Sequence, residues 1–266
     1  MAQVEKLERP EGAIAYEVEG SGPLIVALPG MGELRSSYRF TVPALVNAGF
    51  RVATMDLRGH GDSDATFSRY DDVAAGEDAL ALIKHLGGPA TIIGNSMGAG
   101  AATWAAAEQP KAVTSLVLIG PFVRNAPVNP LMALLFKVAM SGPWATKMWI
   151  GYTPKLYGNQ PEDFDSHLSE IAASMRLPGH AKAFRATTRT NHALAEARLS
   201  EIKAPVLVIM GEKDPDFPDP TAEASWIAEK LKADTVMVPG AGHYPQAENP
   251  DQVNTAIEAF LKRFSN

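Results

Sequence analysis

Short apolar runs alternate along the chain with longer segments whose apolar residues recur at helical spacing. The runs have four to six residues and the composition of strands buried on both faces of a parallel sheet. They are Leu24–Leu28, Arg51–Met55, Ala90–Ile93, Ser115–Ile119, Pro205–Met210 and Thr235–Val238. Residues Ala13–Val18 instead follow a more alternating pattern, which predicts an antiparallel strand at the sheet edge.

Amphipathic segments lie between these runs and predict the helices that cover the sheet. They are Ser37–Asn47, Asp71–Leu86, Met97–Glu108, Pro220–Leu231 and Asp251–Phe264. Strands that alternate with helices in this way are typical of an α/β protein with a parallel sheet covered on both faces. The pattern therefore predicts this fold class.

One region breaks the alternation. From Pro121 to about Lys203 there is no convincing strand, and several helical segments are interrupted by proline or glycine. We therefore predict a core formed by residues 1–121 and 203–266 and a helical cap formed by residues 122–202. Most Met and aromatic side chains of this region should pack within the cap, and a few should line an apolar pocket. The pocket candidates are Phe122, Trp144, Met148 and Trp149. Removal of such a cap should change substrate preference more than it changes the catalytic residues.

Composition narrows the range of partners. Hydrophobic residues make up 46% and charged residues 20% of the chain, as in a soluble globular protein. The net charge is −6 and no dense Lys/Arg cluster occurs, which argues against nucleic acid or an anionic membrane as the main partner. No apolar stretch reaches the ~18 residues of a transmembrane helix, and Leu131–Met140, interrupted by Lys137, predicts a buried or cap helix. The expected partner is a small molecule.

Cysteine is absent from the chain, which excludes disulfides, thiol nucleophiles and Cys-ligated metals. Residues Met1–Pro10 include four charged side chains and lack the apolar segment of a signal peptide. Both features predict a cytoplasmic protein.

The strongest chemical signal is Gly94-Asn95-Ser96-Met97-Gly98, which has the pattern G-x-S-x-G. It follows a predicted strand directly and opens a predicted helix, so Ser96 should lie exposed at a sharp turn. The helix N-terminus next to it favours a developing oxyanion. Ser96 is therefore the candidate nucleophile.

A serine nucleophile needs a base, and His243 lies in a loop just after the last predicted strand. Ligand chemistry collects at such carboxyl ends of strands in open α/β sheets. Of the other histidines, His60 is expected to be structural and His85 to lie at a helix end. The remaining three are expected to be surface or cap residues: His167, His180 and His192.

The base needs a carboxylate to hold its tautomer, and the loop after Pro205–Met210 supplies candidates. They are Glu212, Asp214 and Asp216, with Asp219 as a further rival of Asp214. Pro215 restricts Asp214 to extended conformations, which suits a side chain that reaches across a loop. Asp216 is expected to turn toward solvent or cap a helix, and Asp219-Pro220 predicts a helix N-cap.

These motifs resemble the α/β-hydrolase superfamily, within its small cap-bearing serine hydrolases of the esterase type. The likeness extends over essentially the whole chain and rests on five ordered motifs. They are Leu28–Gly32, Asp56–Ser63, Gly94–Gly98, Gly211–Asp214 and Gly240–His243. The resemblance implies a mostly parallel sheet of roughly eight strands, flanked by helices, with a helical cap inserted between strands 6 and 7.

The resemblance also implies roles for particular residues. The triad would be Ser96, Asp214 and His243, and the oxyanion hole would be formed by the N–H groups of Met31 and Met97. The family's usual His-Gly is Pro29-Gly30 here. Serine in place of an aspartate nucleophile disfavours the dehalogenase and epoxide hydrolase branches.

The expected reaction is hydrolysis of a carboxylic ester, with an apolar ester as substrate and with no metal or organic cofactor. The same triad also serves C–C bond hydrolases, lactonases, thioesterases and perhydrolases, and some relatives of this type act as ligand sensors. The motifs leave these alternatives open, because a fold and a triad do not fix a substrate.

Overall fold

The computed structural model describes residues 3–125 and 130–264 and contains one mixed sheet of eight strands. The strands are β1 (Glu5–Arg9), β2 (Gly12–Gly20), β3 (Leu24–Leu28), β4 (Arg51–Met55), β5 (Ala90–Asn95), β6 (Val113–Ile119), β7 (Val206–Gly211) and β8 (Asp234–Val238). Their order across the sheet is β1-β2-β4-β3-β5-β6-β7-β8, with β1 and β2 antiparallel to their neighbours and the other pairs parallel. The predicted fold class and sheet are confirmed.

The predicted edge strand is the one strand that was assigned the wrong place. Residues of β2 do pair antiparallel with β4, but β1 pairs with their other side and forms the edge. Four of the five residues of β1 are charged, and Leu7 alone is buried. A strand with a single core contact carries almost no apolar signal, which is why the pattern did not predict it.

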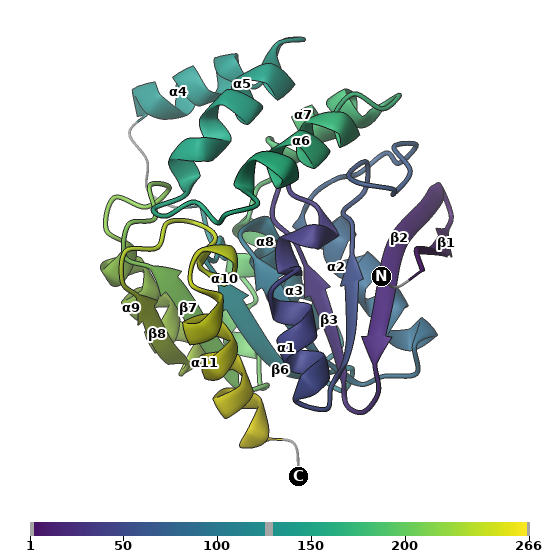
Figure 1. Ribbon diagram of the computed structural model, residues 1–266, viewed down its shortest axis with the longest axis vertical. Helices are drawn as coiled ribbons and strands as arrows, with labels where there is room; N and C mark the ends of the chain where they lie inside the picture. The colour runs from purple at the N-terminus through teal and green to yellow at the C-terminus, as the bar shows by residue number, and fades with distance from the viewer. Residues whose placement is uncertain (1–2, 126–129, 265–266) are drawn as a thin grey trace.

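Helices cover both faces of the sheet (Figure 1). One apolar cluster joins the sheet to α2 (Asp72–His85), α3 (Met97–Glu108) and α9 (Pro220–Leu231). A second cluster joins its other face to η1 (Arg35–Tyr38), α1 (Thr41–Asn47) and α11 (Pro250–Lys262). Residues of β3 and β5 alternate between the two clusters, as the pleat of a strand requires.

The segment between β6 and β7 is helical, as predicted. It contains α4 (Pro130–Ala139), α5 (Ala145–Tyr152), η2 (Thr153–Leu156), α6 (Phe164–Ser174), α7 (His180–Thr187), α8 (Ala193–Glu196) and η3 (Leu199–Glu201). Helices α4 to α7 form a layer at one end of the molecule (Figure 1), and a third apolar cluster joins this layer to Leu34, Tyr244 and Ala247 of the core. In contrast, α8 and η3 pack against α3. Among the described residues, no helix is both long and apolar enough to span a membrane.

Candidate active site

Ser96 occupies the sharp turn between β5 and α3, and its backbone adopts φ 54° and ψ −122°. This left-handed φ is rare for a residue with a side chain and costs roughly 1–3 kcal/mol, so surrounding contacts must hold it. The N–H of Ser96 donates to the carbonyl of Ile119 over 2.9 Å, and Ser96 O accepts from the N–H of Phe122 over 3.3 Å. The turn is thus fastened to the end of β6, and Ser96 lines a cavity.

The loop after β3 lies directly against this turn. A Cβ atom on Gly30 would lie 2.9 Å from the Cβ of Ser96, so this position accepts only glycine. Met31 and Met97, the two predicted oxyanion-hole residues, both line the same cavity as Ser96. Met97 begins α3, where N–H groups have no acceptor within the helix and point toward the turn. Substitution of the family's histidine by Pro29 leaves this close approach in place.

His60 supports the loop that contains Met31. Its Nε2 accepts the N–H of Gly32 over 3.1 Å, and its Nδ1 lies 3.0 Å from the carbonyl of Arg58. Burial lowers the pKa of His60 to about 4, so the ring is neutral at neutral pH and can accept at Nε2. His60 is therefore a structural residue, as predicted.

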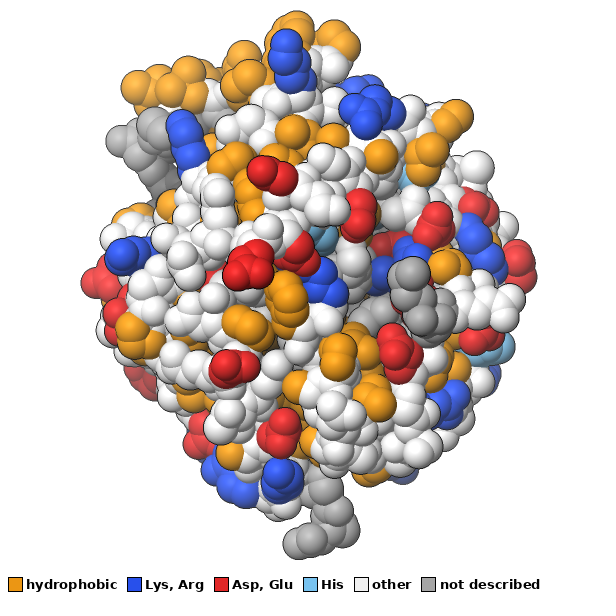
Figure 2. Space-filling view, in the orientation of Figure 1, with side chains coloured by type: hydrophobic (Ala, Val, Ile, Leu, Met, Phe, Trp, Pro, Cys, Tyr) orange, Lys and Arg blue, Asp and Glu red, His pale blue; other side chains and the backbone are white. Residues whose placement is uncertain are grey.

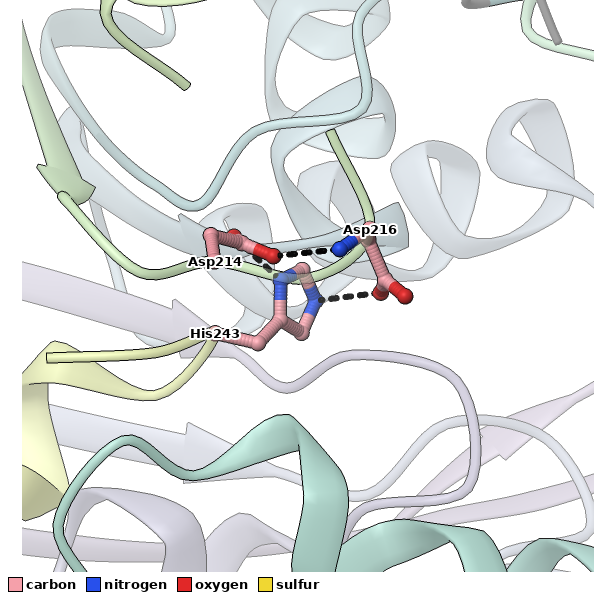
Figure 3. Close-up of side chains that lie close together, drawn as sticks. All are labelled: Asp214, Asp216 and His243. Atoms are coloured by element: carbon pink, nitrogen blue, oxygen red, sulfur yellow. Dashed lines mark hydrogen bonds and ion pairs between the residues drawn. The ribbon is translucent and has the colours of Figure 1, made fainter. Parts of the chain in front are cut away.

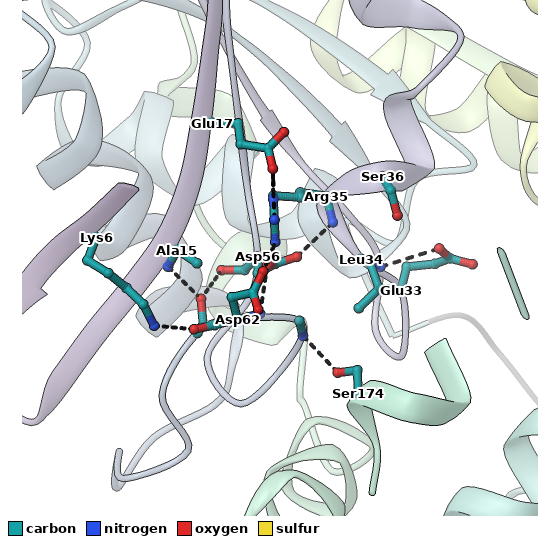
Figure 4. Close-up of polar contacts among 12 residues, drawn as sticks. Lys6, Ala15, Glu17, Glu33, Leu34, Arg35, Ser36, Asp56, Asp62 and Ser174 are labelled. Carbon is teal, nitrogen blue, oxygen red and sulfur yellow. Dashed lines mark hydrogen bonds and ion pairs between the residues drawn. The ribbon is translucent and has the colours of Figure 1, made fainter. Parts of the chain in front are cut away.

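The buried carboxylate of Asp56 joins the loop after β3 to the loop after β4 (Figure 4). Asp56, at the end of β4, accepts the N–H of Arg35 over 2.8 Å and the N–H of Asp62 over 3.1 Å, and it pairs with the Arg35 guanidinium. Arg35 also binds Glu17 over 2.8 Å. Burial raises the pKa of Asp56, and the Arg35 charge opposes that shift. Residues of the motif Asp56–Ser63 thus stabilise the loop after β3.

His243 lies in the loop after β8, with Asp214 beside it in the loop after β7 (Figure 3). Nδ1 of His243 is 2.7 Å from Oδ2 of Asp214, and both side chains are buried. Asn95, next to the serine, donates from Nδ2 to the carbonyl of His243 over 3.3 Å and to that of Ile119 over 3.0 Å. Ser96 and His243 both line the cavity. The structure therefore brings the three predicted residues to one place.

Glu248 also belongs to this site, although no motif of the chain predicted it. Its buried carboxylate accepts the N–H groups of Gly242 and Tyr244, the residues that flank His243, over 2.9 and 3.1 Å. It also accepts the N–H of Gly158, in the helical insertion, over 2.8 Å. Burial raises the pKa of Glu248 and these backbone donors oppose the shift. Glu248 therefore positions the histidine loop.

The insertion also touches His243 through its backbone. The N–H of His243 donates to the carbonyl of Leu156, at the end of η2, over 2.7 Å. That removal of the cap changes substrate preference more than the predicted triad stays a prediction, and η2 is the part of the cap whose loss would affect His243 directly, because it supplies this backbone acceptor.

Asp216 was expected to face solvent or to cap a helix, and the structure corrects this. Its side chain is 23% exposed, lines the cavity and places Oδ2 3.7 Å from Nε2 of His243 (Figure 3). The Tyr152 hydroxyl donates to its Oδ1 over 3.4 Å. Asp214 and Asp216, on either side of Pro215, thus face the two nitrogens of one ring, an arrangement that spacing along the chain does not reveal. Asp219 caps α9 by accepting the N–H of Ala222 over 2.9 Å, as predicted.

Two carboxylates change the proton affinity of the base. Burial lowers the pKa of His243, but the charges of Asp214 and Asp216 outweigh it and raise that pKa to about 9. Burial also raises the pKa of Asp216, with the His243 charge acting in the opposite direction. An ordinary imidazole titrates near 6.5, so the pH range in which this base is neutral lies higher than the sequence alone suggests.

Asp214, Asp216 and His243 also form a group whose ligand atoms lie within 4.8 Å of one another. A metal ion there would have to compete for Nδ1 and Oδ2 atoms that already pair with each other at 2.7 Å. These residues therefore suit proton transfer better than metal ligation.

The cavity measures about 820 Å³ and lies between the core and the insertion. The apolar residues that line it include Met31, Phe136, Met140, Trp149 and Tyr244. The polar residues that line it include Asn125, Thr187, Thr188, Thr190 and His192. Of the predicted pocket residues, Phe122 and Trp149 line the cavity. Trp144 and Met148 are about half exposed and do not, because they point away from it on α5 and its N-terminal end.

Side-chain pairs fasten the insertion to the core. Nε2 of His167 lies 2.8 Å from Oε2 of Glu33, and Nδ1 of His192 lies 2.6 Å from Oδ2 of Asp72. Both acids are buried. His167 and His180 are themselves buried rather than at the surface. The pairs involve residues far apart in sequence, which motif reading could not connect.

Comparisons with known proteins show the family and the fold of the chain. A family model described as "Alpha/beta hydrolase family" matches residues 25–256. The 3-oxoadipate enol-lactonase 2 of Acinetobacter baylyi is 29% identical over 220 residues, which cover 80% of this chain and 79% of that protein. The 2-(acetamidomethylene)succinate hydrolase of Mesorhizobium japonicum is 28% identical over 255 residues, which cover 91% of this chain and 89% of that protein. The crystal structure of a bromoperoxidase from Bacillus anthracis superimposes with a TM-score of 0.84 at 21% identity, over 98% of this chain and 100% of that one.

Proposed function

The chain belongs to the alpha/beta hydrolase family, and we propose that it hydrolyses a carboxylic ester through an acyl-enzyme formed on Ser96. The observation that carries the proposal is the left-handed turn at Ser96, which faces the same cavity as a buried His243–Asp214 pair. A serine held at such a turn has little structural value, whereas a nucleophile needs that exposure.

The reaction would proceed in two halves. Oγ of Ser96 attacks the ester carbonyl carbon as Nε2 of His243 takes the hydroxyl proton, and the N–H groups of Met31 and Met97 stabilise the oxyanion. The C–O bond to the alcohol then breaks, and His243 returns the proton to the leaving oxygen. Water attacks the acyl-enzyme with the same base, and the acid leaves as Ser96 regains its proton. Asp214 holds Nδ1 protonated throughout and stabilises the imidazolium.

The proposed substrate is a small, largely apolar ester. Apolar side chains that line the cavity, such as Phe136, Met140 and Trp149, suit an alkyl or aryl group beside the reacting carbonyl. The relative from Acinetobacter baylyi is named a lactonase, and a lactone is a cyclic ester, so its name supports the same bond class for this chain. We therefore propose linear and cyclic carboxylic esters as the substrates to test first.

A series of p-nitrophenyl esters with acyl chains of increasing length tests this proposal. We expect many turnovers per protein molecule and a preference for one range of chain length, since the cavity is bounded. A protein that only senses a ligand would release at most one equivalent of p-nitrophenol from every ester. That result with fully folded protein would contradict the proposal.

A further inference from the structure

Helix α4 presents apolar side chains to solvent. Leu134, Leu135 and Val138 are 56%, 53% and 54% exposed. Leu134 and Val138 are four residues apart and therefore lie on the same face of the helix. Trp144, the N-cap of α5, and Met148, within α5, are 51% and 49% exposed. Figure 2 shows hydrophobic side chains gathered over this end of the molecule. The cap helix that the sequence predicted is thus not a buried one.

Large exposed apolar side chains in one region mark a surface that binds something. This surface, which we call the α4–α5 face, is defined by Leu134, Leu135, Val138, Trp144 and Met148. It adjoins the cavity, because Phe136, Lys137 and Met140 of the same helix line that cavity. Whatever covers the face therefore lies next to the cavity.

Charge around the face indicates the kind of partner. No Asp or Glu occurs between Glu108 and Glu162, whereas Lys137, Lys147 and Lys155 lie in that interval. Residues 122–190 contain eight Lys/Arg and four Asp/Glu, a net charge of +4 in a chain of net charge −6. None of the three lysines forms an ion pair with a residue in the described parts of the chain. The negative total therefore conceals a positively charged end.

We infer that the α4–α5 face docks on an anionic lipid surface. An amphipathic helix with apolar and basic side chains lies in the boundary between headgroups and acyl chains, and nearby lysines are attracted to anionic headgroups. Tryptophan, such as Trp144, favours the same boundary. A second copy of the chain fits less well, because a symmetric contact would place the lysines of both copies against one another. Docking of this kind does not depend on the proposed reaction.

Vesicle binding tests the inference. The probes are vesicles of phosphatidylcholine alone and of phosphatidylcholine mixed with phosphatidylglycerol, and bound protein is measured by flotation at low and high salt. We expect binding to the mixed vesicles that weakens with salt and is much lower for phosphatidylcholine alone. Ser96→Ala should bind as well as the wild type, so failure of docking and failure of the proposed chemistry are distinguishable.

Two variants and one control locate the binding surface. Lys147→Glu with Lys155→Glu should weaken binding about tenfold or more, and Leu134→Ser with Leu135→Ser and Val138→Ser should abolish it. The control, Lys84→Glu with Lys111→Glu, changes exposed lysines at the C-terminus of α2 and just before β6 and should bind almost as the wild type does. Circular dichroism establishes that each variant is folded.

Several results would overturn the inference. Wild-type protein that does not float with mixed vesicles at low salt would do so, as would a folded triple serine variant that floats like the wild type. A wild-type dimer in sedimentation that becomes a monomer in the triple variant would assign the face to a second copy instead. Equal loss of binding in the control variant would show that only total charge matters.

Discussion

The core and the insertion meet at one cavity but contribute to it in different ways. Core residues of the site stand at the ends of β3, β5, β7 and β8, where backbone hydrogen bonds and close glycine contacts hold each loop. The insertion contributes short helices that reach the core through side-chain pairs such as His167–Glu33. The proposed reacting groups thus come from the core, whereas the insertion is joined to the core by side-chain pairs and by an apolar cluster.

This division has one exception, at η2. The carbonyl of Leu156 and the N–H of Gly158 bind the histidine loop, directly and through Glu248. The insertion therefore also helps to position His243. We expect changes in the core to lower kcat more than changes in the insertion.

Two serines that line the cavity give the largest contrast. Ser96→Ala should lower kcat by about 10⁶-fold, because it removes the nucleophile, by analogy with serine protease variants. Ser141→Ala, in the insertion, removes a similar hydroxyl from the same cavity and should change kcat by less than about twofold. Steady-state hydrolysis of a p-nitrophenyl ester checks both. Similar losses in the two variants would remove the distinction between the regions.

Asp214, the proposed acid of the triad, should give the next largest effect. Asp214→Asn should lower kcat about 10⁴-fold, because the amide stabilises the wrong imidazole tautomer. Asp219→Asn, five residues further along the chain, should leave kcat nearly unchanged and at most cost ~1 kcal/mol of stability through its helix cap. Kinetics and urea denaturation measure the two effects. A silent Asp214→Asn would require another acid partner for His243.

Replacement of Glu248 tests whether its contacts to the insertion and to the histidine loop position His243. Glu248→Gln replaces one accepting oxygen by a donor that faces backbone N–H groups, so His243 should shift and kcat should fall about 10²-fold. The charge of Glu248 helps to raise the pKa of His243, so the pH dependence of kcat should keep its shape and move slightly toward lower pH. Glu258→Gln on α11 is the matched control and should have no effect on kcat. A kcat in Glu248→Gln equal to that of the wild type would contradict the positioning role.

These residues also mark how far the sequence alone leads. Ser96, His243 and Asp214 belong to motifs in which a strand, a turn and a helix follow each other, so local pattern places them. Asp216 and Glu248 act through contacts across loops, at 3.7 Å and 2.9 Å, that depend on how two chain segments fold back. Trp144 and Met148 were indistinguishable from Trp149 by composition, because the sequence of a short helix does not say which side faces the cavity.

The pH dependence of ester hydrolysis tests the paired carboxylates. His243 must be neutral to accept the serine proton, and its pKa is raised to about 9, so kcat/KM should fall as the pH decreases below about 9. Asp216→Asn should move this inflection about 1 to 3 pH units toward acid, since a negative charge next to Nε2 is lost. Its rate near pH 7 should then rise. A wild-type inflection near pH 6.5 that Asp216→Asn leaves in place would contradict this geometry.

The smallest effect is expected on the insertion side of the cavity. Phe136→Ala removes an apolar side chain that lines the cavity. It should raise KM for long acyl esters by about threefold to tenfold, with little change for acetate esters. Val138→Ala, on the same helix but outside the cavity, is the control for both substrates. Equal changes for short and long esters would mean that Phe136 does not contact the acyl chain.

The central claim is that Ser96 forms the acyl-enzyme, and covalent labelling tests it most directly. A fluorophosphonate reacts with serine nucleophiles as an ester does but leaves a stable adduct that mass spectrometry can assign to a peptide. We predict one adduct per chain, located on Ser96, with loss of ester hydrolysis in proportion to labelling and no adduct in Ser96→Ala. An adduct on another residue, or full hydrolysis by protein labelled at Ser96, would contradict the account.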